Sequence, residues 1–112
     1  MKESYPIYVQ WRSVVAYMLD LCSKYPKTVR FSLCDRITNR TLDVMGDIVE
    51  AIYSSSKIPI LKSANLSLEQ LRVLMQISHD CQYISLKQYE YVGRAINDTG
   101  KMIGGWLKQC DV

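Results

Sequence analysis

Apolar residues recur at intervals of three, four and seven along most of this chain, which is the spacing of one face of an α-helix. The pattern is clear in the last quarter of the sequence, and the other side of that segment carries charges of both signs. We therefore predict a helix over residues 86–108 with one buried face and one face in water. The predicted buried stripe consists of Leu86, Tyr89, Val92, Ile96, Ile103 and Trp106.

Three further segments repeat this periodicity and predict helices over residues 7–24, 33–53 and 59–80. A long amphipathic helix needs partners to cover its apolar stripe, so the four segments are expected to pack together. The predicted core positions of the first three helices are Ile7, Trp11, Val14, Val15, Met18, Cys22 and Tyr25; then Leu33, Ile37, Thr41, Val44, Ile48 and Ile52; then Leu61, Ala64, Leu68, Leu71 and Met75.

Local signals mark several of the predicted helix ends. Tyr25 precedes Pro26, and a residue before proline avoids the α-helical region, so the first helix should stop near this point. Ser32 is a favourable N-cap for the second helix. Ser85, followed three residues later by Gln88, predicts a capping box at the start of the last helix.

The connectors between the four predicted helices are short, which forces consecutive helices to lie antiparallel. The chain shows no sustained alternation of apolar and polar residues and no hairpin turn signal, so strands are not expected. The predicted fold is all-α, an up-down-up-down antiparallel four-helix bundle that forms a single domain over residues 1–112. The third helix carries a second apolar row, which predicts contact with two neighbours or with another subunit. That row is Ile60, Leu66, Val73 and Ile77.

Composition is typical of a globular protein, with 48% hydrophobic and 22% charged residues. No apolar run approaches the roughly 18 residues that a membrane span requires. The N-terminal stretch also lacks the charged head and unbroken apolar run of a signal peptide. We therefore expect a cytoplasmic protein with no membrane partner.

The sequence offers little that points to catalysis or metal binding. The four cysteines form no CxxC pair, and the single histidine, His79, belongs to no Glu-x-x-His motif. No glycine-rich phosphate loop is present; Gly104 and Gly105 suggest close helix packing or a thinned helix end instead. We predict no enzymatic activity, no catalytic residues, no metal and no cofactor.

Charge is unevenly distributed in the region of the second helix. Residues 24–40 contain five basic residues and one acidic residue, whereas residues 41–56 contain three acidic residues and no basic one. One interpretation is a solvated face on which Arg40 pairs with Asp43 or Asp47. The other is that the basic helix start and its connector bind phosphate with the help of free N–H groups, or that the face docks head to tail on a second subunit.

Two motifs at the ends of the matching region carry a family resemblance. Residues 26–31 read PKTVRF and residues 100–106 read GKMIGGW, with LDVMGDIVEAIYS between them. Together they resemble the accessory variability determinant (Avd) proteins of diversity-generating retroelements. These belong to a four-helix-bundle family that includes proteins encoded in ribosomal-RNA intervening sequences. The resemblance covers residues 24–108.

The resemblance implies a pentameric ring of four-helix bundles with a basic surface. Such a ring would bind the reverse transcriptase of the element and RNA or DNA, and would support mutagenic retrohoming without any catalysis of its own. The alternative is a protein-interaction bundle of the intervening-sequence type with no nucleic-acid role. The residues expected to contact nucleic acid or a partner are Lys27, Arg30, Arg36 and Arg40, which match basic positions of the motif, together with Lys24, Arg94, Lys101 and Lys108.

Overall fold

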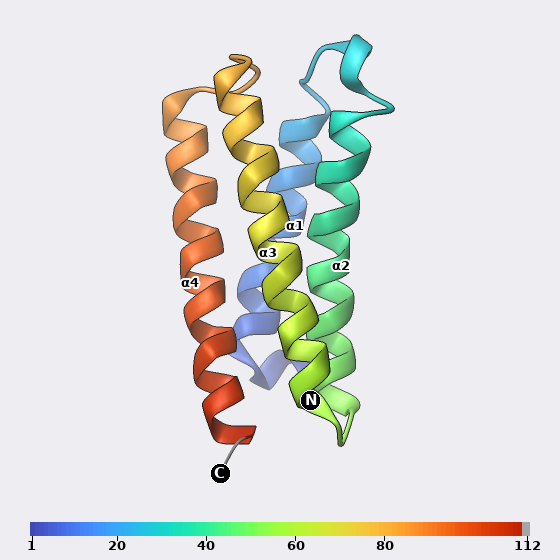
Figure 1. Ribbon diagram of the computed structural model, residues 1–112, viewed down its shortest axis with the longest axis vertical. Coiled ribbons are helices and arrows are strands. Elements are labelled where there is room, and N and C mark those ends of the chain that lie inside the picture. Colours follow the sequence, from blue (N-terminus) through green and yellow to red (C-terminus); the bar gives the residue numbers. More distant parts are fainter. Residues whose placement is uncertain (111–112) are drawn as a thin grey trace.

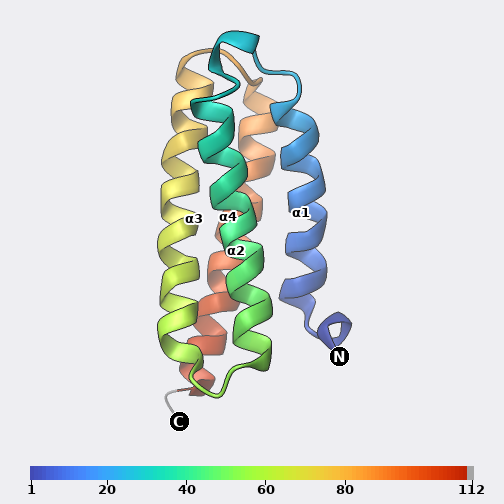
Figure 2. The same ribbon diagram turned by 90° about the vertical axis from the view of Figure 1, so that its right-hand side faces the viewer.

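Four long α-helices make up most of the structure, a computed structural model that describes residues 1–110. They run antiparallel in sequence order and form a rod of 46 × 22 × 22 Å (Figures 1 and 2). The predicted all-α, up-down four-helix bundle is confirmed. The helices are α1 (Pro6–Cys22), α2 (Leu33–Tyr53), α3 (Lys57–Asp80) and α4 (Leu86–Cys110), and two short 3-10 helices are η1 (Lys2–Ser4) and η2 (Lys27–Val29).

The core lies along the axis of the rod and receives side chains from all four helices. Consecutive helices pack against each other, and α1 packs against α4 to close the bundle. Trp11, Ile37, Leu61 and Ile103 are fully buried, one from each helix. Most of the predicted stripe positions are buried in the same way, because the spacing of three and four places them on one side of each helix. The periodicity therefore identified the inner faces of the four helices.

One prediction about burial is wrong, and another is left untested by a single chain. Leu86 was expected in the core but is 59% exposed, because the connector residue Ile84 fills the buried position at that end of the bundle and is only 6% exposed. The second apolar row of α3 makes few contacts within the chain, and its predicted contact with another subunit stays a prediction. Ile60 is partly buried against the core. The other members, Leu66, Val73 and Ile77, are all exposed, so the inner face of α3 is narrower than its apolar surface.

The capping box at the start of α4 is confirmed. The backbone N–H of Ser85 donates to Oε1 of Gln88 over 2.9 Å, and the N–H of Gln88 donates to Oγ of Ser85 over 3.1 Å. Ser32 does occupy the N-cap of α2, but its side chain makes no capping hydrogen bond. Its hydroxyl instead donates to the carbonyl of Val29 over 3.4 Å. The N–H groups in the first turn of α2 therefore receive no hydrogen bond from the Ser32 side chain.

Three helix boundaries differ from the predicted ones by two residues, and one of them is the end of α4, at Cys110 instead of Lys108. α1 ends at Cys22 instead of Lys24, because the N–H groups of Lys24 and Tyr25 bond to carbonyls three residues back and tighten the chain into turns. α3 begins at Lys57, which leaves Pro59 within the first turn, where its missing N–H costs no helical hydrogen bond.

The glycine pair near the end of α4 neither ends the helix nor allows close packing. α4 continues through Gly104 and Gly105 to Cys110. A Cβ atom placed on either glycine would meet no heavy atom within 4 Å. The expectation of close helix packing or a thinned helix end is therefore wrong.

Within residues 1–110 the helices lack the combination of length and apolar character that a membrane crossing needs.

Candidate nucleic-acid interface

Four of the predicted contact residues come together at one end of the bundle. The connector between α1 and α2 lies at the same end as the connector between α3 and α4 (Figure 1). Lys24, Lys27 and Arg30 lie on the first of these connectors, and Arg36 lies in the first turn of α2. All four side chains are exposed. We call this region the basic end, defined by Lys24, Lys27, Arg30 and Arg36.

In the described part of the chain, three of these four cations form no ion pair. Lys24 pairs with Asp20 across one turn, with 3.2 Å between Nζ and Oδ2, and both side chains are well exposed. Such a surface pair leaves much of the charge accessible to other ligands. Within residues 1–110, no ion pair involves Lys27, Arg30 or Arg36. The basic end therefore presents three cations outside any ion pair, with the exposed carboxylate of Asp35 beside them in the first turn of α2.

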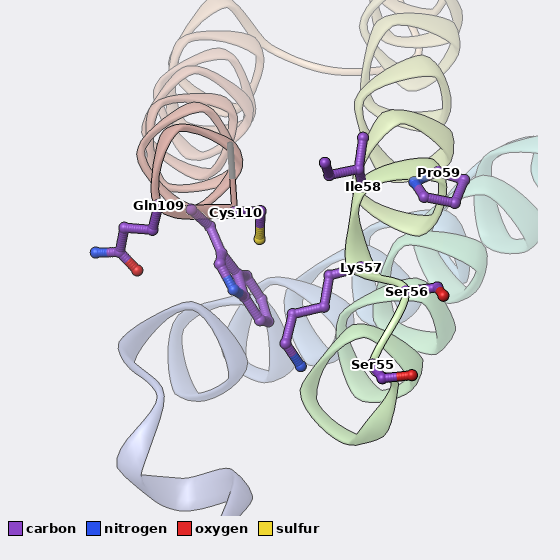
Figure 3. A pocket seen from close by; sticks show the side chains of 8 residues that line it. Ser55, Ser56, Lys57, Ile58, Pro59, Gln109 and Cys110 are labelled. Carbon is purple, nitrogen blue, oxygen red and sulfur yellow. The ribbon is translucent and has the colours of Figure 1, made fainter. Parts of the chain in front are cut away.

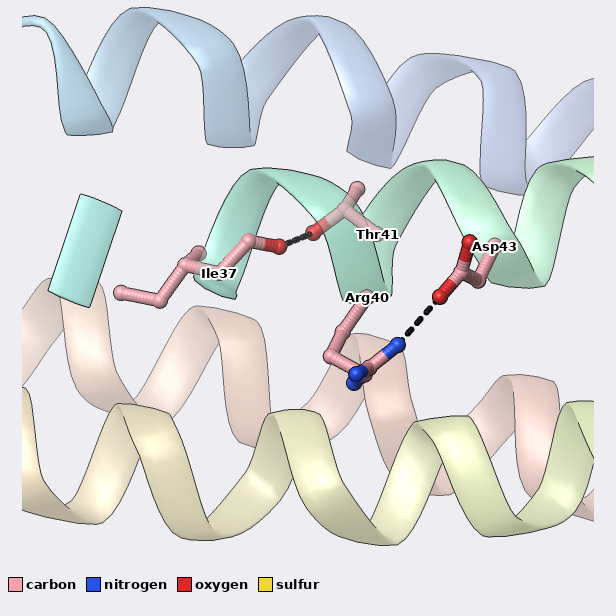
Figure 4. A network of polar contacts seen from close by, with 4 residues as sticks. All are labelled: Ile37, Arg40, Thr41 and Asp43. Carbon is pink, nitrogen blue, oxygen red and sulfur yellow. Dashed lines mark hydrogen bonds and ion pairs between the residues drawn. The ribbon is translucent and has the colours of Figure 1, made fainter. Parts of the chain in front are cut away.

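Arg40 differs from the other basic residues of this region. Its guanidinium forms an ion pair with the carboxylate of Asp43, one turn further along α2 (Figure 4). The structure thus realises the pairing that was one of the two interpretations of this helix face. Since its charge is balanced locally, Arg40 contributes less positive potential to the basic end than Arg36 does.

The acidic half of α2 lies beyond Arg40, toward the opposite end of the bundle. It carries Asp43, Asp47 and Glu50. Burial raises the pKa of Asp47, an effect opposed by its hydrogen bond with Ser63 and reinforced by the charges of Glu50 and Asp43. The surface of α2 therefore changes sign along its length, from positive near the connector to negative near Tyr53.

The remaining predicted contact residues lie apart from this cluster. Arg94, Lys101 and Lys108 are all exposed on α4, which runs from the basic end to the other end of the rod. A rise of 1.5 Å per residue separates Arg94 from Lys108 by about 21 Å. Arg94 borders a hollow of about 340 Å³ between α1 and α4, where Asp98 is also present. The structure does not join these three residues into the basic end.

Packing beneath the connector holds the basic end in place. Tyr25 is buried and its ring lies 5.6 Å from that of Tyr83, so the two connectors are packed together. The thiol of Cys34 donates to the carbonyl of Cys22 over 3.7 Å. Burial raises the pKa of the Cys22 thiol to about 12 and also raises the pKa of Cys34. Both thiols stay neutral at pH 7 and do not reduce the local positive charge.

A hollow of about 600 Å³ lies at the opposite end of the bundle (Figure 3). Lys57 and Trp106 contribute to its wall. The Nζ atom of Lys57 donates to three carbonyls at the end of α2, those of Ala51, Ile52 and Ser54, over 2.6, 3.3 and 2.7 Å. This cation therefore caps a helix. No group of three potential metal ligands occurs in the part of the chain that the structure describes.

Comparison with known proteins agrees with this fold. A family model described as bAvd-like matches residues 7–110. The chain belongs to the bAvd-like family. The predicted resemblance to Avd proteins is thereby confirmed, whereas a search of curated proteins finds no match.

A solved structure shares the fold of this bAvd-like chain. It is the crystal structure of a protein with unknown function from the S23 ribosomal protein family of Bacteroides thetaiotaomicron. The alignment covers 96% of this chain and 99% of that chain, with a TM-score of 0.82 and 17% sequence identity. At this identity the similarity shows the fold alone.

Two residues of this bAvd-like protein gain importance from the structure. Phe31 belongs to the motif of residues 26–31, but the sequence pattern assigned it no function. In the structure it is 84% exposed and lies at the basic end. The available signal was its position, since it is the only phenylalanine of the chain and lies outside every apolar stripe. Lys57 was not singled out either. Its partners are backbone carbonyls, which leave no trace in the residue pattern.

Proposed function

We propose that this protein is a non-enzymatic accessory protein of a diversity-generating retroelement, which holds a reverse transcriptase and RNA or DNA together. The observation that carries the proposal is the cluster of exposed, unpaired cations at the basic end: Lys27, Arg30 and Arg36. Membership of the bAvd-like family supports the retroelement context.

The geometry of the basic end suits phosphate better than base edges. Lysine and arginine contacts to phosphates supply affinity without reading sequence. The first turn of α2 adds N–H groups that the Ser32 side chain does not cap, and a helix N-terminus favours an anion. We therefore expect binding that tolerates many sequences and weakens steeply with added salt.

The test is a fluorescence anisotropy titration of labelled RNA and DNA over a series of salt concentrations. Replacing Lys27, Arg30 and Arg36 together with alanine should weaken binding and lower the salt slope by about two to three units. The matched control replaces Lys2, Arg12 and Lys62 with alanine. It removes the same amount of positive charge, but from positions toward the other end of the rod. Equal affinity for wild type and the first variant would remove the basic end from the proposal.

The other candidate residues are tested separately. Arg40→Ala should have a smaller effect than Arg36→Ala, because Asp43 already balances the charge of Arg40. Lys24→Ala should behave in the same way because of Asp20. A triple alanine variant of Arg94, Lys101 and Lys108 asks whether the α4 surface belongs to the same contact. A full loss of binding in this variant alone would move the interface to α4.

We further propose that the protein is a homo-oligomer, and that the ring is a pentamer as the family resemblance implies. The uncovered apolar row of α3 supports this, since Leu66, Val73 and Ile77 are exposed and follow one another at intervals of seven and four. Light scattering should give about five times the 12.9 kDa mass of one chain. Val73→Lys should dissociate the assembly, whereas Leu19→Lys, a change at an exposed position of α1, should not.

The reverse transcriptase partner is tested by co-purification with the enzyme encoded nearest to the gene of this protein. Wild-type protein should retain the polymerase, and the charge-reversal variant Arg30→Glu with Arg36→Glu should show whether the basic end contributes. A protein that assembles but binds neither polymerase nor nucleic acid at low salt would instead support the second candidate, a protein-interaction bundle. The exposed α3 row is the observation that favours this candidate.

A further inference from the structure

The connector that carries the basic end also carries an aromatic side chain that is exposed to water. Phe31 is 84% exposed, whereas most large apolar side chains of the described chain are buried or half-buried. A fully buried phenylalanine stabilises a fold by about 1.5–3 kcal/mol, so the fold gains little from this one. The first turn of α2 contributes Cys34 and Ile37 to the core instead. Phe31 is therefore available to a ligand.

Three cations lie close to Phe31 along the chain, together with one carboxylate, that of Asp35. Arg30 precedes Phe31 directly, Lys27 lies four residues earlier at the start of η2, and Arg36 follows in the first turn of α2. Their positive charges are unpaired within residues 1–110. An exposed aromatic ring among cations is the combination by which proteins bind single-stranded nucleic acids, with the cations on the phosphates and the ring against a base.

The backbone under Phe31 is held by hydrogen bonds within the connector. The N–H of Arg30 donates to the carbonyl of Lys27 over 3.2 Å, and the N–H of Ser32 donates to the carbonyl of Val29 over 3.3 Å. The hydroxyl of Ser32 donates to the same carbonyl. A ring on a turn of this kind loses less conformational entropy on binding than one on a loose loop.

We propose that the basic end binds single-stranded nucleic acid, an inference that rests on the proposed nucleic-acid role. Phe31 stacks on an unpaired base. The flanking phosphates are contacted by Lys27, Arg30 and Arg36. Bases inside a duplex are stacked on each other and leave no face for the ring. The site therefore distinguishes single strands, loops and frayed ends from continuous duplex. Every base has a π-face, so the preference is for strandedness and not for sequence.

The experiment compares a labelled single strand with a blunt duplex of the same sequence, in anisotropy titrations at one low salt concentration. Phe31→Leu keeps an apolar side chain but removes the ring, and should weaken single-strand binding about tenfold with little change for the duplex. Phe31→Trp keeps an aromatic ring and should bind the single strand as tightly as the wild type does. The matched control is Tyr53→Leu, because Tyr53 is also an exposed aromatic, at 62%, but lies at the acidic end of α2.

A direct readout accompanies the affinities. In the background of Trp11→Phe and Trp106→Phe, the tryptophan of the Phe31→Trp variant should lose fluorescence when a single strand stacks on it. Should the two tryptophan changes unfold the protein, difference spectra of the Phe31→Trp variant against the parent with native Phe31 give the same signal. Absence of quenching at saturating single strand would overturn the stacking proposal.

The outcomes separate this inference from the proposed function. If wild type binds neither strand form, the nucleic-acid role fails and the stacking role fails with it. If the cation variants lose binding but Phe31→Leu does not, or if it weakens single strand and duplex equally, only the stacking role is overturned. If Phe31→Leu leaves nucleic-acid binding intact and instead lowers polymerase capture or the assembly mass, Phe31 is a protein contact and the inference is wrong.

Discussion

The indole nitrogen of Trp11 on α1 donates a 2.9 Å hydrogen bond to the backbone carbonyl of Thr41 on α2. Both residues are fully buried. The hydroxyl of Thr41 in turn donates to the carbonyl of Ile37 over 2.8 Å (Figure 4). This link fixes the rotation of α1 relative to α2 near the middle of the bundle, because a shift of either helix would break a buried hydrogen bond.

Trp11→Phe should destabilise the protein by about 2–4 kcal/mol. The change leaves a cavity and removes the donor for the Thr41 carbonyl. Urea unfolding followed by circular dichroism measures the loss. The control is Trp106→Phe, because Trp106 is only half-buried at the end of the bundle and packs against Tyr5. Equal losses for the two variants would contradict the role assigned to the buried hydrogen bond.

Lys57→Met should destabilise the protein by about 1–3 kcal/mol, because the three carbonyls at the end of α2 lose their charged donor while the apolar stem is kept. Hydrogen exchange should speed up in the last turn of α2 before it does elsewhere. Lys62→Met is the control at an exposed position of α3. A variant as stable as the control would show that water caps α2 equally well.

Ser85→Ala should cost about 1 kcal/mol, because it removes the side chain that caps α4. Ser32→Ala should cost much less, although Ser32 holds the equivalent position at α2, since its hydroxyl makes no capping bond. Thermal unfolding of both variants provides the comparison. The double variant Ser85→Ala with Gln88→Ala should lose less than the sum of its parts. Strict additivity would argue against a reciprocal cap.

Gly105→Ala should raise the free energy of unfolding by about 0.5–1 kcal/mol. The residue lies inside α4, is exposed, and has no heavy atom within 4 Å of an added Cβ. Alanine then restricts the unfolded chain at no steric cost. Gly46→Ala in α2 should behave alike, because its surroundings are equally open. A loss of stability that appears only in the assembled protein would place Gly105 at a subunit contact.

The thiol of Cys22 should resist alkylation in the folded protein. Burial raises its pKa from 9.0 to about 12, so at pH 8 the folded chain holds about a thousandfold less thiolate at this site. Iodoacetamide labelling with mass spectrometry should show Cys81, which is exposed, modified first. Urea should restore the reactivity of Cys22. Fast labelling of Cys22 without denaturant would contradict its burial.

The same shift in pKa makes stability depend on pH in alkaline solution. Between pH 9 and about 12 the unfolded chain loses the proton of Cys22 while the folded chain keeps it. The folded state therefore binds more protons, and the free energy of unfolding falls as pH rises through this range. Cys22→Ala should flatten that part of the profile. An unchanged slope would assign the alkaline loss to other groups.

The sequence predicted the inner faces of the helices well, because burial follows a helical period that the apolar residues display directly. It predicted the capping box for a different reason, because Ser85 and Gln88, whose N–H groups and side chains bond to each other, are three positions apart in the sequence. The wrong position has a local cause. Leu86 fits the period, but Ile84 fills the place next to it. Leu66, Val73 and Ile77 of α3 fit the period as well, and they are exposed in the single chain. Periodicity shows which residues can be buried, while the number of neighbours decides which are.

The candidate site was less accessible to sequence reasoning. The cluster of Lys27, Arg30 and Arg36 follows from closeness along the chain. Helical spacing offered Arg40 two acidic partners, Asp43 and Asp47, and the structure selects Asp43. Arg94, Lys101 and Lys108 have the right charge and lie elsewhere along the rod. The exposure of Phe31 depends on how the connector turns, which is set by hydrogen bonds of the backbone.

The antiparallel order of the helices has a consequence for the electric field of the molecule. Each helix carries a macrodipole equivalent to about half a charge of opposite sign at its two termini. At the basic end, α1 and α3 finish while α2 and α4 begin, so the charges equivalent to the four macrodipoles cancel in pairs. The polarity of the rod therefore resides in its side chains. Point substitutions can move, reverse or abolish it while the backbone stays the same.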